Sequence, residues 1–326
     1  MKKQIVAAAV AATMSAVALA DISITGAAKV NYTNVDSGVS GTADVNKFTQ
    51  ETDIKIKGKN GDTEVVVNFG GGALDNTDTA STARTSSTSE TFEVEDVYVK
   101  TNVAGVTIQT GTWDNGNNEL RASSRADGKF SAKTSIQGID LSMAANSNGA
   151  SGEEFGIGTN LGGVALSYTK KTAGESIKAS TTLAGVGVKY HAEQSDTAQS
   201  DRTYVELSGK VGDVSVKVGQ AEADTSATIE GDTWMGDFEG ASGAYDLSGG
   251  QDVTTVELST SMAGNKVTFR NTQIDGVSGE DTDFNKVIVT RPLASGATFE
   301  LTYTALDDTD NDNDSDTLDL ELAVSF

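Results

Sequence analysis

The chain ends on a segment in which apolar and polar residues alternate. Residues 317–326 place Leu318, Leu320, Leu322, Val324 and Phe326 on one parity and polar or small residues on the other. This period of two predicts a β-strand with one apolar and one polar face. Ten residues are about the length that a tilted strand needs to cross a bilayer. An unprotected apolar strand is a template for pairing, so we expect this one to close a barrel; a sandwich edge strand is the alternative.

The same alternation begins at residues 21–32 and recurs between short, glycine-bearing turns. These turns are predicted at residues 59–62, 103–105, 137–138, 162–163, 184–185, 211–213, 263–265 and 294–296. Eight short turns join sixteen strands, and the first and last strands bring the expected count to eighteen. Phe92 and Val94 share one parity while Val97 and Val99 share the other, which predicts a β-bulge in that strand.

Longer polar connections alternate with the short turns. They are expected at residues 34–46, 70–89, 114–128, 146–152, 170–174, 195–201, 221–251, 275–282 and 307–316. Outer-membrane barrels have short turns at the periplasmic rim and long loops at the extracellular rim. The pattern therefore predicts an all-β fold, a transmembrane antiparallel up-and-down β-barrel with short periplasmic turns and long extracellular loops.

Residues 1–20 have the pattern of a secretory signal peptide. Lys2 and Lys3 precede an apolar, alanine-rich run that ends on Ala18-Leu19-Ala20, a suitable cleavage site. We expect the mature domain to be residues 21–326, exported to the cell outer membrane and in contact there with lipid and lipopolysaccharide.

Composition narrows the choice of class. The chain has 35 glycines, one proline and no cysteine, so turns are frequent and no disulfide is available. Its formal net charge of −23 argues against binding to nucleic acid, which needs a basic surface. The single histidine, His191, and the absence of cysteine leave no convincing catalytic triad or zinc site, so we expect neither an enzyme nor a cofactor.

Three features make the chain resemble the general diffusion porins of Gram-negative outer membranes. They are the predicted signal peptide, the alternation of short turns with long loops, and a last strand that ends on an aromatic residue. The resemblance covers residues 21–326 and implies a homotrimer; porins of this length usually have sixteen strands, which stays open as the alternative count. It also implies that the third outer loop, 114–128, folds into the barrel as a constriction. The charged residues of that loop, which could orient solutes, are Asp114, Glu119, Arg121, Arg125 and Asp127; a merely solvated loop is the alternative.

Strand parity assigns further charges to the barrel interior, because a charge on the lipid face costs about 2 to 4 kcal/mol near the midplane. The candidates for pore lining are Lys29, Lys55, Lys133, Arg270, Glu64 and Glu257. They predict a water-filled lumen; the alternative is a plugged barrel in which such charges pair across strands.

Carboxylates are dense in the last connection. Asp308, Asp310, Asp312, Asp314 and Asp316 alternate through residues 307–316 and offer hard oxygen ligands for Ca²⁺. The segment lacks the glycine and the distal glutamate of a helix-loop-helix calcium site, and a solvated acidic loop is the alternative.

The leading hypothesis is a passive channel for small hydrophilic solutes and ions. Acidic outer loops concentrate cations at the mouth, so we expect a cation preference. A substrate-selective channel is the first alternative, ranked lower because the inward parity has few aromatic residues. A structural or adhesive barrel without a channel is the second.

Overall fold

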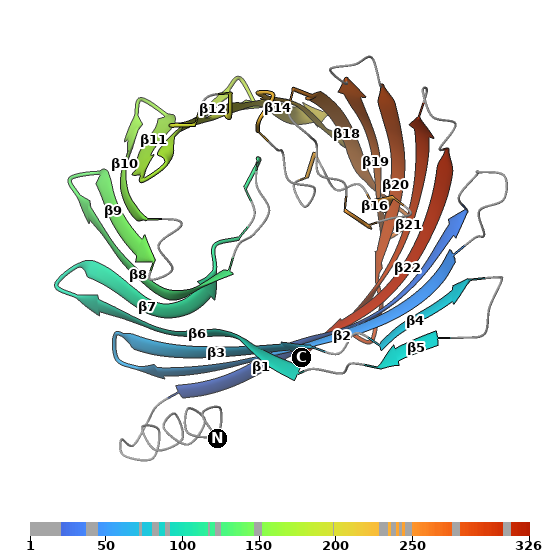
Figure 1. Cartoon of the computed structure of the whole chain (residues 1–326), viewed down its shortest axis with the longest axis horizontal. Helices are drawn as coiled ribbons and strands as arrows, with labels where there is room; N and C mark the ends of the chain where they lie inside the picture. The colour runs from blue at the N-terminus through green and yellow to red at the C-terminus, as the bar shows by residue number, and fades with distance from the viewer. Residues whose placement is uncertain are drawn as a thin grey trace.

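Strands make up most of the described chain, and they form one closed ring (Figure 1). The computed structural model describes residues 21–36, 45–71, 74–79, 85–88, 92–116, 118–120, 125–146, 152–197, 199–227, 234–235, 239–240, 243–244, 250–275, 281–308 and 314–326. The predicted signal peptide, residues 1–20, lies outside these ranges. No helix of the described residues is long and apolar enough to span a membrane.

Eighteen strands of the described chain form the wall of the ring, each antiparallel to the next. They are β1 (Asp21–Asp36), β2 (Val45–Asn60), β3 (Thr63–Gly71), β6 (Phe92–Val103), β7 (Val106–Asp114), β8 (Arg125–Ile136), β9 (Ile139–Asn146), β10 (Glu153–Leu161), β11 (Val164–Lys171), β12 (Gly174–Leu183), β13 (Val186–Ser195), β14 (Arg202–Val211), β15 (Val214–Ala223), β18 (Asp252–Met262), β19 (Asn265–Asp275), β20 (Thr282–Pro292), β21 (Ala297–Asp308) and β22 (Ser315–Ser325). The predicted barrel of eighteen strands is therefore confirmed, and the alternative of sixteen is wrong.

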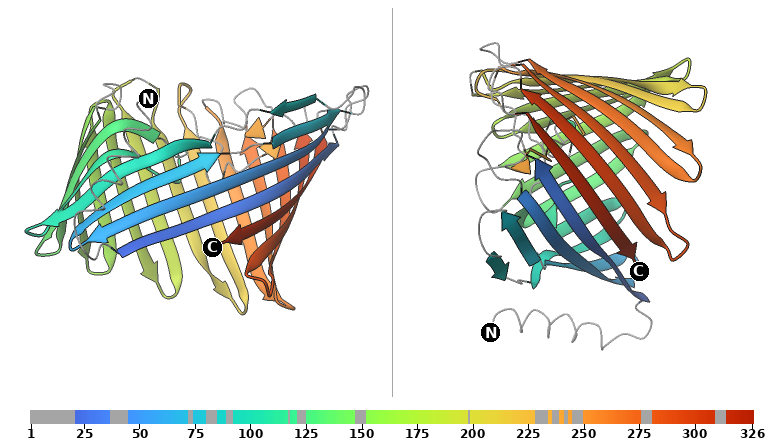
Figure 2. Two further views of the ribbon diagram at one scale, coloured as in Figure 1. Left: turned by 90° about the horizontal axis from the view of Figure 1, so that it is seen from below. Right: turned by 90° about the vertical axis from the view of Figure 1, so that its right-hand side faces the viewer.

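The first and last strands close the ring. β22 pairs with β1 from Ala27 opposite Ser325 to Asp36 opposite Asp316. Beyond that ladder, the Phe326 N–H donates to the Gly26 carbonyl at 2.9 Å, and the Gly26 N–H donates to the Phe326 carbonyl at 2.8 Å. Along this ladder each of the two strands has a partner on both sides, and the strands tilt strongly across the wall (Figure 2).

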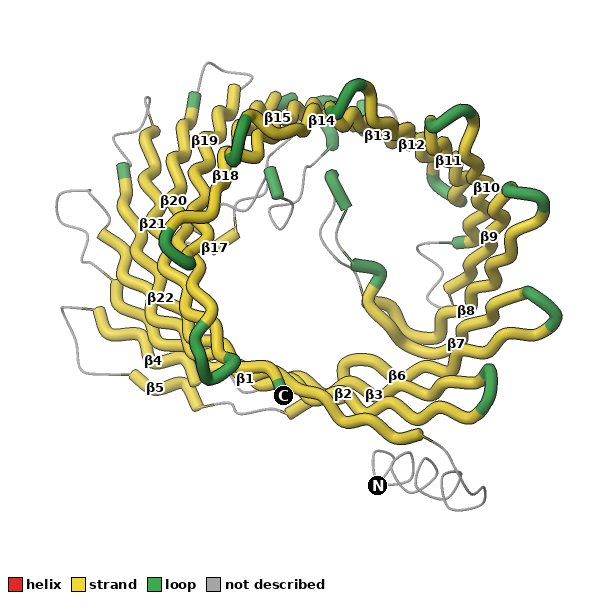
Figure 3. Tube along the Cα trace, turned by 180° about the vertical axis from the view of Figure 1, so that it is seen from behind, coloured by secondary structure: helices red, strands yellow, loops and turns green. Residues whose placement is uncertain are grey.

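All eight predicted short turns are present, and the alternating direction of the strands places them at one rim. Ala104 and Gly105 both have positive φ, 52° and 84°. Two consecutive residues with positive φ form a two-residue hairpin turn whose twist matches the twist of the strands on either side. At the other rim, the predicted loop at residues 170–174 is instead a tight turn at 172–173 between β11 and β12. Figure 3 shows these connections in green between the yellow strands.

The second predicted loop, residues 70–89, contains ordered strands, so that expectation is wrong in part. β4 (Leu74–Thr79) and β5 (Thr85–Thr88) form a hairpin, and β4 pairs with β2 above the end of β3. Two further short strands, β16 (Glu239–Gly240) and β17 (Gly243–Ala244), pair with one another between β15 and β18.

The bulge predicted in β6 is confirmed. Asn68 lies opposite Asp96, while the next residue, Phe69, lies opposite Val94, so Glu95 is the extra residue. The Glu95 carboxylate accepts a hydrogen bond from the Asn68 amide at 3.1 Å. The extra residue shifts the alternation of β6 by one position. Apolar residues before the bulge therefore have even numbers and those after it have odd numbers.

The two faces of the wall differ in chemistry. Large apolar side chains are exposed on the outward face, among them Leu141, Ile157, Leu166, Val205, Leu258 and Leu322. Directly opposed residues of an antiparallel pair lie on the same face of the sheet. The inward-facing residues can therefore be followed from strand to strand through the pairing register. One such inward row runs through Lys178, His191, Tyr204, Ala221, Val253 and Ile274.

Candidate functional site

The register places all six charges that parity assigned to the interior on the inward face. The Lys29 ammonium lies 2.7 Å from the Glu51 carboxylate on β2. The Glu64 carboxylate lies 2.6 Å from the Lys57 ammonium. Lys55 lies opposite Asn68, and Lys133 lies opposite Ser142. Many inward charges thus pair across strands, as the plugged alternative also expected.

Glu257 on β18 forms ion pairs with two cations, the predicted pore-lining residue Arg270 and the neighbouring Lys217. Its carboxylate accepts from the Arg270 guanidinium at 2.8 Å and lies 3.6 Å from the Lys217 ammonium. Three adjacent strands, β15, β18 and β19, therefore present two cations around one carboxylate. Removing that carboxylate would leave the two cations facing each other.

The segment that follows β7 projects into the ring (Figure 1). The Glu119 carboxylate reaches the opposite wall, where it accepts from Lys178 at 3.2 Å and from the Nδ1 of His191 at 3.1 Å. Leu120 is completely buried beside it. Asn118 shapes the segment by accepting the Leu120 N–H at 2.8 Å. The third outer connection therefore crosses the lumen through Glu119.

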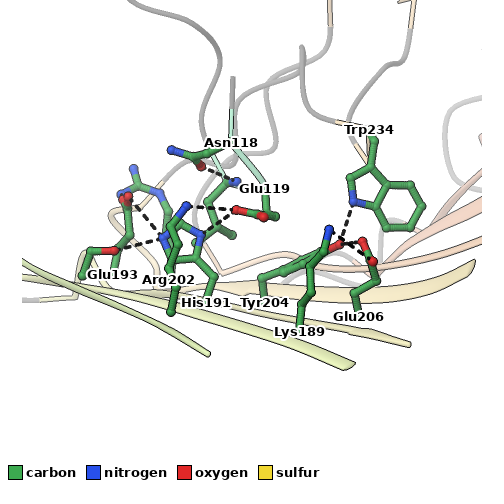
Figure 4. Close-up of polar contacts among 12 residues, drawn as sticks. Asn118, Glu119, Lys189, His191, Glu193, Arg202, Tyr204, Glu206 and Trp234 are labelled. Atoms are coloured by element: carbon green, nitrogen blue, oxygen red, sulfur yellow. Dashed lines mark hydrogen bonds and ion pairs between the residues drawn. The ribbon is translucent and has the colours of Figure 1, made fainter. Parts of the chain in front are cut away.

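His191 is almost fully buried, with 2% of its surface exposed. Its Nε2 lies 3.1 Å from the Ser176 hydroxyl and 3.7 Å from the Glu193 carboxylate. Because a carboxylate can only accept, Nδ1–H donates to Glu119. Figure 4 shows the imidazole between Glu119 and Glu193. No sequence pattern predicts contact between this histidine and Glu119, because 72 positions separate them.

The cationic surroundings of Glu119 hold the pKa of its carboxyl well below the usual range. The hydrogen bond from His191 is the main cause, and Lys178 adds to it, while partial burial opposes both. The carboxylate is consequently charged through the whole physiological range. It anchors its segment to β12 and β13 by charge-assisted hydrogen bonds.

A second segment, between β15 and β18, lies on the inner wall at Trp234 and Met235. The Trp234 indole N–H donates to the Tyr204 hydroxyl at 2.7 Å, and the Lys217 ammonium lies 3.7 Å from the centre of the Trp234 ring. Tyr204 in turn donates to Glu206 at 2.6 Å. Figure 4 shows Trp234 above Tyr204 and Glu206.

The two segments meet in an apolar cluster inside the ring. We call it the inner apolar cluster: Leu120, Tyr204, Ala221, Ala223, Ala227, Met235, Val253, Ile274 and Phe284. Leu120 comes from the first segment and Met235 from the second, and both are fully buried. The two segments therefore narrow the lumen against β14, β15, β18, β19 and β20.

Beside this cluster, a cavity of about 1160 Å³ adjoins the wall from β7 to β13. Its inward lining combines small and hydroxyl residues with Glu119, Lys133, Asp140, Lys178, Lys189 and His191. Polar walls of this kind suit water and hydrophilic solutes.

Of the other charged side chains of the third loop, the structure describes that of Asp114. Asp114 ends β7 and accepts the Gly116 N–H at 2.7 Å, and its backbone lies opposite that of Arg125. Arg121 and the side chains of Arg125 and Asp127 lie outside the described part of the chain. Their role at a constriction stays a prediction.

The calcium expectation also stays a prediction. Asp314 and Asp316 lie at the start of β22, Asp308 ends β21, and Asp310 and Asp312 fall outside the described residues. Within the ranges that are described, no group of three or more carboxylate or histidine side chains could hold a metal ion.

Known proteins resemble this chain at the level of the fold. No family model and no curated protein matches the sequence. Among solved structures, Acinetobacter baumannii OccAB4 has a TM-score of 0.66 at 10% identity, covering 94% of this chain and 98% of that one. A BenF-like porin from Pseudomonas fluorescens Pf-5 has a TM-score of 0.66 at 14% identity, with the same coverage. Pseudomonas aeruginosa OpdK with vanillate has a TM-score of 0.65 at 12% identity, again covering 94% and 98%.

These likenesses define the class of fold. The chain has the eighteen-stranded barrel of outer-membrane porins over nearly its whole length.

Proposed function

We propose that the chain is an outer-membrane porin that forms a water-filled channel for the passive diffusion of small hydrophilic solutes and ions. One observation carries the proposal: a closed ring of eighteen strands exposes apolar side chains outward and charged side chains inward. An apolar belt faces lipid at low cost, whereas inward charges need water. A soluble barrel would have the opposite arrangement.

Location and assembly follow from the same proposal. Residues 1–20 would direct export and be removed, and the outward face would contact outer-membrane lipid and lipopolysaccharide. We propose a homotrimer. No enzymatic activity and no cofactor are part of the proposal, and nucleic acid is not a partner for so acidic a chain.

A substrate-selective channel is the second candidate, and two observations favour it. The lumen is narrowed by the segments that carry Leu120 and Met235. It also has more aromatic lining than parity predicted, because Trp234 comes from a connection and Trp113 packs edge-on against inward-facing Tyr98. Pseudomonas aeruginosa OpdK, which has a similar fold, was crystallised with vanillate.

Liposome swelling tests the function and separates the two candidates. Vesicles carrying the purified protein are diluted into isotonic solutions of neutral sugars of increasing size. A passive channel predicts swelling rates that fall smoothly with size, and a selective channel predicts swelling with few solutes irrespective of size. Vesicles that contain folded barrels yet swell with none of these solutes or ions would overturn both.

A further inference from the structure

The Trp234 ring lies against a site on the inner wall that we call the aromatic seat: Tyr204, Lys217 and Gly219. A Cβ atom at Gly219 would lie 2.5 Å from Cζ2 of Trp234 and 3.2 Å from the sulfur of Met235. Any other residue at 219 would therefore push the ring off the wall. The absence of a side chain at Gly219 leaves the space that the ring occupies.

The seat is held by the barrel and not by its occupant. Tyr204 donates to Glu206, which also lies 3.3 Å from the Lys189 ammonium. Lys217 lies 3.6 Å from Glu257, which Arg270 holds from the other side. These partners belong to strands β13, β14, β15, β18 and β19, so the seat keeps its shape when Trp234 leaves it.

The polar groups of the aromatic seat determine which kind of aromatic ring can bind there. The Tyr204 O–H donates its hydrogen bond to Glu206, so towards the ring the hydroxyl oxygen can only accept a hydrogen bond. The Lys217 ammonium above the ring favours an electron-rich π face. Phenols and indoles combine a planar electron-rich ring with an O–H or N–H donor. A saturated ring has no π face, and toluene has no donor.

We propose that the aromatic seat is a binding site for solutes of the phenol or indole class, and that Trp234 occupies it as the chain's own ligand. A solute that takes the seat replaces Trp234 and releases Trp234 and Met235 from the wall. The proposal deepens the proposed function and rests on it in one respect, that solutes enter the ring.

Intrinsic fluorescence tests the exchange without requiring ion flow. The chain has two tryptophans, Trp113 and Trp234, so the full-length variant W113F reports on Trp234 alone. Phenol is the probe, with excitation at the red edge where phenol does not absorb, and cyclohexanol is the control of similar size. Phenol should shift the Trp234 emission to the red in a saturable manner, and cyclohexanol should not. No phenol shift, or the same shift with cyclohexanol, would overturn the proposal.

Two variants separate binding at the seat from binding elsewhere. In W234A the seat is vacant, so calorimetry should find phenol bound more tightly than in the unaltered chain. In the double variant W234A/G219V the added side chain fills the seat, and binding should be lost. Equal phenol affinity in the two variants would place the site elsewhere and contradict the proposal; if the double variant does not fold, an unaltered affinity in W234A would contradict it.

The outcomes also distinguish this proposal from the channel proposal. A protein that responds to phenol but carries no current retains the seat and loses the channel. A protein that conducts but shows no phenol response retains the channel and loses the seat.

Discussion

Glu119 ties the first in-folded segment to the wall of the barrel through polar contacts. Its carboxylate accepts from both Lys178 and His191, and charge-assisted bonds of this kind contribute about 1.5 to 3 kcal/mol each. We expect Glu119→Gln to weaken docking of residues 118–120 and to raise single-channel conductance. Asp140→Asn, a carboxylate on the lining of the same cavity, serves as the matched control.

The pH dependence of this contact has a defined sign. Because docking lowers the pKa of Glu119, its contribution is fully present above the undocked pKa, near 4.5, and declines as the pH falls below that value. The ratio of wild-type to E119Q conductance should therefore be constant from pH 8 to about 5 and move towards one in stronger acid. A ratio that changes between pH 5 and 8 would contradict control by the Glu119 carboxylate.

Glu257 contributes to the electric field at the inner wall of the barrel, because it lies between two cations. Glu257→Gln leaves Lys217 and Arg270 adjacent without their shared carboxylate. The cation preference measured as a reversal potential in a salt gradient should decrease, and Arg270→Gln should shift it the opposite way. Shifts of the same sign in both variants would contradict an electrostatic origin.

Parity alone could predict which charges point inward, because side chains alternate across a strand whatever their partners are. It could not predict the contacts of Glu119 or Trp234. Glu119 meets a residue 72 positions further along, and Trp234 meets one 30 positions earlier. Such contacts depend on the path of a connection, which has no periodic pattern to read.

The connection between β15 and β18 places Trp234 and Met235 against the inner wall of the barrel. Its ends lie together, since the Gly250 N–H donates to the Ala223 carbonyl at 3.0 Å. Deleting residues 228–249 should therefore leave the hairpin closed, remove Trp234 and Met235 from the wall, and increase single-channel conductance. Unchanged conductance of a folded deletion variant would exclude a narrowing role for this connection.

The strand β22 closes the ring through its last residue. Deleting Phe326 removes the two backbone hydrogen bonds to Gly26 and exposes the glycine that lies under the aromatic ring. We expect this variant to lose the heat-resistant, fast-migrating form on gels that marks a closed barrel. Phe326→Tyr, which keeps the ring and the backbone, should retain it.

Strands in which apolar and polar residues alternate could be predicted from the sequence. The number of strands and the short turns follow from that alternation, and the bulge in β6 follows from the one place where the alternation breaks. The β4–β5 hairpin could not be predicted, because its polar sequence, LDNTDT followed by TSST, has no apolar face. Pairing with β2 forms it, and that pairing is a tertiary contact.

At the scale of the whole molecule, fixed charge is distributed unequally between the connections and the wall. Residues 307–316 hold six aspartates and no base. A field of this kind is screened over about 8 Å at physiological salt. We expect a cation preference that arises at the outer mouth and falls as ionic strength rises. Anion selectivity at low salt would show that wall residues such as Lys133 and Arg270 dominate.

The measurement that tests the channel most directly is a planar-bilayer recording of the purified protein. We expect discrete current steps on insertion, in groups of three for a homotrimer, with a reversal potential of cationic sign at low salt. Heat-resistant barrels that insert into the bilayer and carry no current steps would contradict it.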